Sequence, residues 1–318
     1  MKFPVSIFSL VILTLTASFA QDKEAAPKTT NLPPDPFGDL EPVPVIPDYA
    51  MKVDRTRGLM TIDAKDGTYV PGSHFAHWNW TTNAKRWGNY YVTLNYESVA
   101  TKMGINVKIG DNTVKSYAPR TSSGEPKLGD ITLGTIYVPK SGEYPVTLLS
   151  ADKSNGPAFF VRGLTIHPAP EGKVEGQSID GSIELLAKTA TTYSEMMRYE
   201  PKPEKNCLGY WIDEKDWAEW VFEAGMPGKF KVSVVQGCGT GNGGSEVAVL
   251  VNDQTLKFTV EDTGGFQEWK TLEIGEVEIK HAGEQKLAIM PLKKSAKAVM
   301  DIQKIFLEPV AAKTAAAE

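Results

Sequence analysis

The sequence predicts an all-β protein built from two tandem antiparallel β-sandwich domains. Two observations support this fold class: apolar residues alternate with polar ones along short segments, and the second half of the chain repeats the first. Residues 131–168 align without a gap on residues 272–309 at a constant offset of 141, and residues 105–117 align on 247–259 at an offset of 142. A repeat of this kind indicates two copies of one folding unit.

The alternation has a period of two in both halves. In residues 229–234, Lys and Ser alternate with Phe and Val, and residues 247–251 and 144–148 follow the same rule. This period is typical of a strand with one face on a core and the other in water. Short strands separated by Gly, Asn and Asp favour an antiparallel sandwich over a helical fold.

Two glycines occupy equivalent places inside predicted strands. Gly134 and Gly275 lie 141 residues apart, each flanked by alternating apolar residues. A glycine in mid-strand often marks a β-bulge, where the strand bends. We therefore expect one bulge at the same place in each module.

The chain before the first repeat has a different character. Residues 1–20 resemble a secretory signal peptide, with Lys2 before an apolar run and small residues before a predicted cleavage site at Gln21. Residues 21–50 are rich in proline and polar residues, which predicts an extended tether. The modules are then expected at 51–170 and 175–310, with a flexible tail at 311–318, so the protein is expected to be secreted, to the extracellular space or the periplasm.

The two copies differ in length near their beginnings. Residues 64–68 align on 187–191 at an offset of only 123, so the second copy gains about 19 residues before the offset reaches 142. We expect this gain opposite residues 78–105 of the first copy. The glycine-rich segment 238–244 is the predicted loop tip there.

Composition and motifs argue against several functions. The formal net charge is −5, which disfavours nucleic acid and anionic membranes as partners. The sequence contains no nucleophile elbow, zinc-protease motif or phosphate loop. No enzyme activity is therefore predicted.

The chain has two cysteines, Cys207 and Cys238, both in the second module. In an exported protein such a pair favours a structural disulfide, and two separate free thiols are the alternative. They lack the spacing of a zinc site.

Residues 209–309 carry an ordered set of motifs, comprising 209–211 (Gly-Tyr-Trp), 216–220, 227–232, 264–269, 282–284 and 300–303. This pattern resembles carbohydrate-binding modules of families 6 and 35 and the accessory modules of secreted bacterial sulfatases and fucosidases. The resemblance implies a jelly-roll, galactose-binding-like sandwich that holds sugar in loops at one end. It covers the first module through the repeat.

The resemblance also implies site residues. An aromatic ring is expected in the loop before the strand at Leu272, where Phe266 and Trp269 lie, and Trp211 belongs to the first motif. The asparagine that the family often places before the last strand is replaced by Val299, and by Ala158 in the first copy. No cofactor is expected, although the family's calcium site has approximate counterparts in Asp63 and Glu184.

The first module has its own aromatic cluster at residues 73–87. In one interpretation this cluster lines a sugar platform, made by His74, His77, Trp78 and Trp80. In the other, the tryptophans fill the end of a sandwich core. Two histidines without a clear third ligand do not predict a metal site. Trp217, Trp220 and Phe222 are expected in the core of the second module.

Together these features predict a secreted, non-catalytic protein that binds a polysaccharide or glycan. The alternative is a structural or protein-interaction module of an exported assembly, whose partner is another exported protein. Exposure of Trp78, Trp80, Phe266 and Trp269 at one sandwich end would favour sugar binding.

Overall fold

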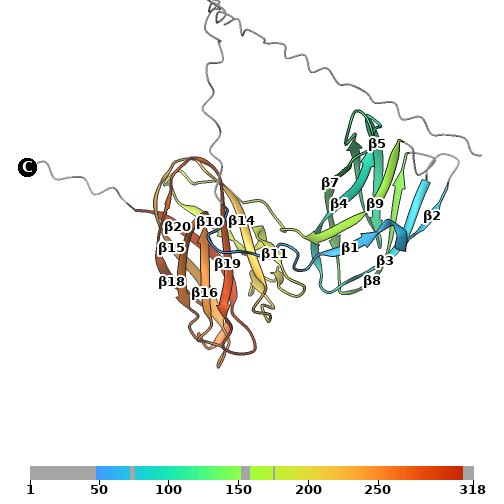
Figure 1. The fold of residues 1–318 in the computed structure, drawn as a ribbon. Helices are drawn as coiled ribbons and strands as arrows, with labels where there is room; N and C mark the ends of the chain where they lie inside the picture. Colours follow the sequence, from blue (N-terminus) through green and yellow to red (C-terminus); the bar gives the residue numbers. More distant parts are fainter. Residues whose placement is uncertain (1–47, 72–75, 152–157, 175, 311–318) are drawn as a thin grey trace, which may run out of the picture. The chain divides into compact units, whose positions relative to one another are not determined.

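A computed structural model describes residues 48–71, 76–151, 158–174 and 176–310. The predicted signal peptide, most of the predicted tether, His74 and the C-terminal tail lie outside these ranges. Figure 1 shows the first module in blue to green and the second in yellow to red. Within the described residues every regular element is a strand, apart from two short 3-10 helices.

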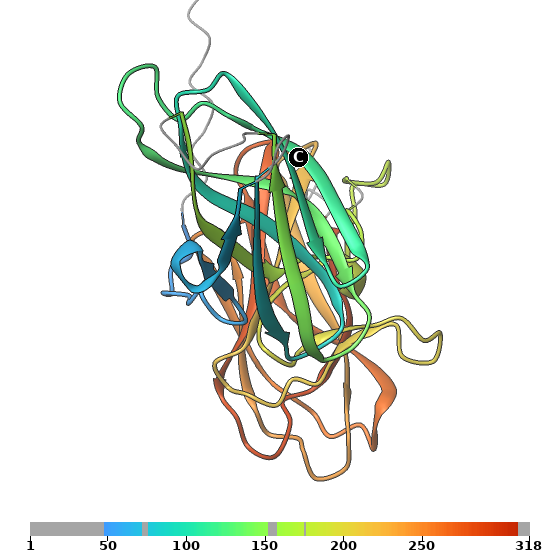
Figure 2. The same cartoon turned by 90° about the vertical axis from the view of Figure 1, so that its right-hand side faces the viewer.

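The first module consists of two antiparallel sheets. The four-stranded sheet has the order β1-β9-β4-β7 and the five-stranded sheet has the order β2-β3-β8-β5-β6. Their elements are β1 (Met60–Asp63), η1 (Ala64–Asp66), β2 (Thr68–Val70), β3 (Ala76–Ala84), β4 (Gly88–Ser98), β5 (Lys102–Ile109), β6 (Asn112–Pro119), β7 (Leu128–Val138), β8 (Gly142–Ser150) and β9 (Phe159–Pro168). Figure 2 shows the long strands of this module from the side.

The second module repeats this topology and adds to it. Its five-stranded sheet is β11-β14-β19-β16-β17, and its other sheet is β12-β13-β20-β15-β18, with β10 also paired to β20. The elements are β10 (Ile183–Leu186), η2 (Ala187–Thr189), β11 (Thr191–Tyr193), β12 (Arg198–Glu200), β13 (Cys207–Gly209), β14 (Trp217–Ala224), β15 (Gly228–Cys238), β16 (Glu246–Val251), β17 (Gln254–Thr259), β18 (Gly265–Ile279), β19 (Gly283–Lys293) and β20 (Asp301–Pro309). The fold class predicted from the sequence is therefore confirmed.

Both predicted bulges are present. Gly134 and Gly275 have φ of +146° and +138°, and the pairing of β4 with β7 and of β15 with β18 shifts beside them. A second pair of shifts leaves Arg162 and Gln303 unopposed, again 141 residues apart. The duplication thus preserves the irregularities of the sheets as well as their order.

The extra residues of the second module lie elsewhere than the sequence predicted. At the end of β3, Ala84 pairs with Gly142, and at the end of β14, Ala224 pairs with Gly283. Ala84 and Ala224 are therefore equivalent, and the offset between the copies is already 140 at this point. The gain therefore precedes β14, where the hairpin β12–β13 has no counterpart in the first module. The segment 238–244 adds only the two residues that bring the offset to 142.

Each module has its own hydrophobic core. Trp78 and Trp80 are buried in the first core, and Trp80 donates a hydrogen bond from Nε1 to the backbone oxygen of Asp63 at 3.0 Å. These two tryptophans are therefore not a sugar platform, because a ring that fills the core between two sheets is closed to a ligand. Trp220 and Phe222 lie in the second core, as expected.

Trp217 is also buried, but it lies against a segment that precedes the first module. Residues 48–57, which we call the strap, pack on the outer face of β14, β16 and β19. The side chain of Tyr49 is buried there, and its hydroxyl donates to Glu219 at 2.8 Å. Trp217 Nε1 donates to the backbone oxygen of Asp54 at 2.8 Å. The end of the predicted tether and the start of the predicted first module thus pack on the second module.

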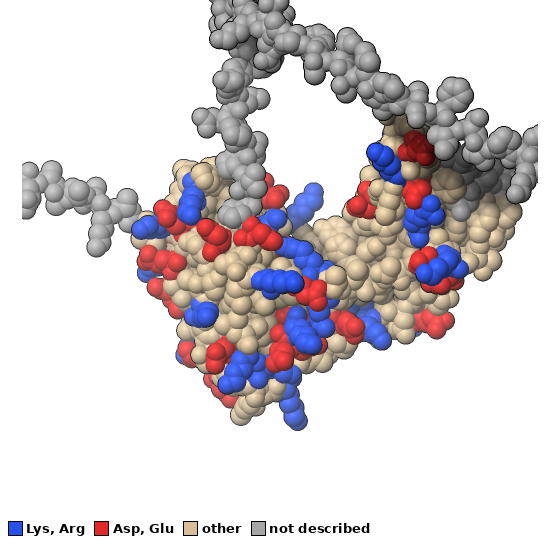
Figure 3. Space-filling model, viewed as in Figure 1, with Lys and Arg blue, Asp and Glu red and all other residues tan. Residues whose placement is uncertain are grey.

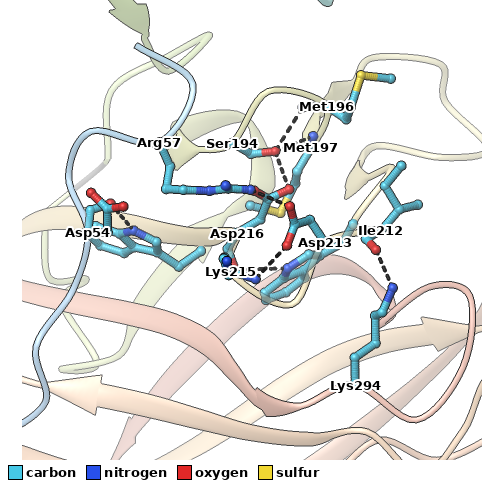
Figure 4. A network of polar contacts seen from close by, with 12 residues as sticks. Asp54, Arg57, Ser194, Met196, Met197, Ile212, Asp213, Lys215, Asp216 and Lys294 are labelled. Atoms are coloured by element: carbon cyan, nitrogen blue, oxygen red, sulfur yellow. Dashed lines mark hydrogen bonds and ion pairs between the residues drawn. The ribbon is translucent and has the colours of Figure 1, made fainter.

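Arg57 anchors the C-terminal end of the strap. Its Nη2 lies 2.6 Å from carboxylate oxygens of both Asp213 and Asp216 (Figure 4). Asp216 is buried and also accepts a hydrogen bond from the hydroxyl of Ser194 at 2.6 Å. The strap therefore neutralises a buried carboxylate of the second module.

On the face that Figure 3 presents, acidic and basic side chains are interspersed. No helix among the described residues is long and apolar enough to cross a membrane.

Candidate functional site

A groove of about 320 Å³ lies on the second module, and it is assembled around the inserted hairpin β12–β13. It is lined by Glu200, Lys205, Tyr210, Trp211, Ile212, Phe266, Gln267, Ala298 and Asp301. The hairpin and the residues that follow it supply five of these nine residues, so this groove exists only where the two copies differ.

Two carboxyl groups line the groove, and a buried thiol lies beside them. In β13 and β20, Leu208 and Ile302 face the core, so their neighbours Cys207 and Asp301 face away from it. Glu200, Cys207 and Asp301 are all buried, and their ligand atoms lie within 4.8 Å of one another. Gly209 leaves open space in front of them, because a Cβ there would lie 3.0 Å from Glu200 Oε2 and 3.4 Å from Asp301 Oδ1.

The two carboxyl groups differ in their partners. Glu200 forms an ion pair with Lys205 at 2.5 Å. Oδ2 of Asp301 accepts from Cys207 Sγ at 3.5 Å and from Gln267 Nε2 at 3.3 Å, both long contacts. Its Oδ1 accepts no hydrogen bond from any described residue, although the residue is only 6% exposed. Asp301 therefore carries an acceptor atom that is free for a ligand.

The electrostatics of Asp301 follow from this position. Burial raises its pKa to about 7, and the negative charge of Glu200 acts in the same direction. A carboxyl group with a strongly raised pKa in a groove is a marker of functional sites.

Aromatic rings form the walls. Tyr210 is 45% exposed and has φ of +61°, a conformation that is rare for an aromatic residue. The guanidinium carbon of Arg198 lies 3.5 Å from the centre of its ring. Phe266 is half-buried and lies against Gly239, where a Cβ would come within 2.6 Å of the ring. The Tyr210 ring thus packs against the Arg198 guanidinium, and the Phe266 ring packs against Gly239.

The structure brings together only part of the predicted sugar-binding set. Trp211 and Phe266 line the groove, whereas Trp269 lies three residues further along β18 and outside the lining. Phe266 and Trp269 belong to β18 itself and not to a loop before it. His77, Trp78 and Trp80 lie on β3 of the first module, and His74 lies outside the described residues.

The predicted disulfide is wrong for this structure, since Cys207 and Cys238 are both free and buried. Cys238 belongs to the core while Cys207 lies beside Glu200 and Asp301, so the two thiols lie on opposite faces of one sheet. Burial raises the pKa of the Cys207 thiol above its usual range and that of Cys238 to about 11. Both are therefore protonated and unreactive at neutral pH.

The acidic residues suggested for calcium have other partners. Asp63 accepts from the backbone nitrogen of Lys65 and pairs with its side chain at 2.9 Å. Glu184 pairs with Lys304 at 2.5 Å.

Sequence reasoning missed Glu200, Lys205, Tyr210, Gln267 and Asp301. The motifs that include Tyr210 and Asp301 were visible, but Trp211 was the one residue selected from them. The offset between the copies offered a signal, because residues 198–209 have no partner in the first copy. Asp301 aligns with Phe160 and Phe266 with Glu125, so the first module lacks both groups at these places.

The chain is similar to solved structures of several β-sandwich proteins. A C-terminal family 6 module of a laminarinase from Zobellia galactanivorans matches with 16% identity and a TM-score of 0.33, over 40% of this chain and 98% of that one. A family 35 module from Clostridium thermocellum matches with 12% identity and a TM-score of 0.33, over 41% and 98%. An α-L-fucosidase from a Vibrio species matches with 16% identity and a TM-score of 0.29, over 77% of this chain but only 40% of the fucosidase.

These likenesses concern strand arrangement alone. No curated protein sequence matches the chain. Residues 191–312, which contain the inserted hairpin and every residue of the groove, match a family described as "Domain of unknown function (DUF5077)".

Proposed function

We propose that the protein is a non-catalytic glycan-binding protein whose second module holds its ligand in the groove between Tyr210, Phe266 and Asp301. The observation that carries this proposal is the free Oδ1 of buried Asp301 between two partly exposed aromatic rings. The proposed location is outside the cytoplasm, where polysaccharides are found.

This combination of groups suits a polyhydroxylated ring. The apolar face of a sugar packs on an aromatic side chain that loses little conformational entropy on binding. A carboxylate oxygen accepts a hydrogen bond from a hydroxyl group, and charge-assisted hydrogen bonds are the stronger kind. Lys205 and Gln267 add donors at the same groove, so donors and acceptors are both available to fix the orientation of the ligand.

The arrangement favours binding over hydrolysis. A glycosidase needs two carboxyl groups that flank the scissile bond, roughly 5–9.5 Å apart. Here Glu200 on β12 and Asp301 on β20 come from the same sheet, on either side of β13. Their oxygens approach within 4.8 Å, and Lys205 already binds Glu200. A sugar therefore meets both carboxyl groups from the same side.

The test is affinity electrophoresis of the full chain in gels that contain a panel of neutral, acidic and basic polysaccharides, followed by calorimetry with the retarding glycan. Tyr210→Ala and Phe266→Ala are each expected to weaken binding by roughly tenfold, about 1.4 kcal/mol. Tyr117→Ala is the matched control, because Tyr117 is 58% exposed but lies on β6 of the first module.

The proposal would be overturned if no polysaccharide of the panel retarded the protein. It would also be overturned if Tyr117→Ala lost as much glycan affinity as the groove variants. Co-purification with another exported protein, without any glycan retention, would instead support the interaction module. Release of new reducing ends from a bound glycan would show that the groove is catalytic and contradict the non-catalytic assignment.

A further inference from the structure

We infer that the groove of the second module selects glycans that carry a cationic amino group, with the ammonium bound between Asp301 and the neighbouring aromatic rings. This inference rests on the proposed function and names the class of sugar that the same groove takes. It follows from the charges that line the groove and from how they are paired.

The acids and bases of the groove do not balance. Its lining contains two carboxyl groups, Glu200 and Asp301, and one amine, Lys205. Arg198 is not part of the lining: it packs on the Tyr210 ring and donates from Nη1 to the backbone oxygen of Met196. Lys205 is committed to Glu200 at 2.5 Å, and none of the ion pairs among the described residues includes Asp301. One buried carboxyl group is therefore left without a cation.

The environment of Asp301 makes a cationic ligand more favourable than a neutral one. Its side chain is 94% shielded from water, so its charge is poorly solvated, and the neighbouring Glu200 repels it further. A hydroxyl group offers only a dipole to such a carboxylate. An ammonium group offers an opposite charge and donors that reach Oδ1.

The walls of the groove also accept cations. The ring of Tyr210 already carries the guanidinium of Arg198 at 3.5 Å from its centre, with Lys205 Nζ at 5.9 Å. Phe266 lines the same groove and has no cation over its ring among the described residues, so its ring is the one that remains available. Aromatic faces attract ammonium groups, and a carboxylate next to them strengthens the attraction.

The size of the groove limits what it holds. About 320 Å³ is at the small end of ligand sites. This volume fits one or two sugar rings. The site therefore recognises a local feature of a polysaccharide, such as an amino group, and does not bind an extended stretch of the chain.

The experiment compares two oligosaccharides with the same backbone, a β-1,4-linked glucosamine tetramer and its fully N-acetylated form, by calorimetry near neutral pH. The full chain is expected to bind the amine form at least about tenfold more tightly. Asp301→Asn, which keeps the shape of the side chain and removes its charge, is expected to abolish that preference. Glu261→Gln is the matched control, because Glu261 is an acid on the same module that pairs with Lys270 and does not line the groove.

Equal affinity for the two tetramers, or a preference that persists in Asp301→Asn, would overturn the inference while leaving glycan binding intact. Competition by a lysine tetrapeptide as strong as that of the glucosamine tetramer would also overturn it, since the groove would then recognise amines of proteins. Should neither tetramer nor any other glycan bind, the proposed function itself would be wrong.

Discussion

At the scale of single residues, the groove concentrates features that cost stability. Asp301 buries a carboxyl group with weak partners, and Tyr210 holds an aromatic residue at positive φ. Each feature opposes folding by on the order of 1–3 kcal/mol. Their occurrence beside one groove is expected of a binding site, where the fold compensates elsewhere for local strain.

The pH dependence of stability should report on Asp301. Its pKa is raised from 3.8 to about 7 on folding, so the native state binds this proton more tightly than the unfolded state. The protonated carboxyl group of Asp301 therefore contributes its full stabilisation of the folded state below about pH 4, and this contribution is lost as the pH rises through 7. Asp301→Asn removes this dependence.

We expect Asp301→Asn to be more stable than the parent at pH 8, by on the order of 1–3 kcal/mol. The difference should vanish near pH 4, as measured by urea unfolding at several pH values. A variant that is less stable than the parent at pH 8 would show that the carboxylate stabilises the fold, contrary to its proposed role.

At the scale of elements, the bulges and the inserted hairpin have different roles. The bulges at Gly134 and Gly275 occur in both copies and set the curvature of the scaffold. The hairpin β12–β13 occurs once and supplies Glu200 at the groove. The site thus combines an element found only in the second module with residues of β18 and β20, strands that both modules share.

Gly275→Ala tests the bulge directly. Its φ of +138° disfavours any side chain, and the new Cβ would lie 3.0 Å from Leu256 Cδ2. We expect a loss of about 1–2 kcal/mol of unfolding free energy in urea denaturation. Gly124→Ala is the control, because no atom lies within 4 Å of its Cβ position and its φ is not positive. Equal effects of the two substitutions would refute this account of the bulge.

The same division explains what sequence could predict. Periodicity and the repeat predict strands and bulges because a strand's pattern is set by local alternation. The groove depends on which residues of β12, β13 and β20 face outward together. Since Cys207 and Asp301 are 94 residues apart, no local pattern indicates their contact. The prediction that the tryptophans of β3 bind sugar failed for a related reason, because an aromatic residue suits a core and a sugar platform equally well.

At the scale of the whole molecule, the strap is the feature that the division into two modules missed. It begins before the first module but packs on the second, with Tyr49 buried and Arg57 bound to Asp216. Residues 48–50 end the Pro-rich segment that composition predicted as a tether, and residues 51–57 were predicted to begin the first module. The partners lie more than 150 residues away in sequence, beyond the reach of any local signal.

Removing the strap's anchor should destabilise the second module. Arg57→Ala leaves Asp216 buried without its cation, and burial already raises the pKa of that carboxyl group. We expect a loss of about 2–3 kcal/mol in chemical unfolding at pH 7. Lys65→Ala, which breaks an exposed pair with Asp63, should change stability by less than about 0.5 kcal/mol. A similar small effect of Arg57→Ala would mean that the strap is not anchored there.

The strap also changes how the chain is held together. Because residues 48–57 pack on the second module, the chain leaves that module's surface, forms the first module and then returns to complete the second. The peptide that joins β9 to β10 is therefore not the only connection between the two modules, because the strap adds a non-covalent one. A single protease cut within this peptide should leave both fragments co-migrating on gel filtration under native conditions, and Arg57→Ala should let them separate. The chain of the first module is thus attached to the second module at both of its ends, through the peptide segment that follows β9 and through the strap that precedes β1.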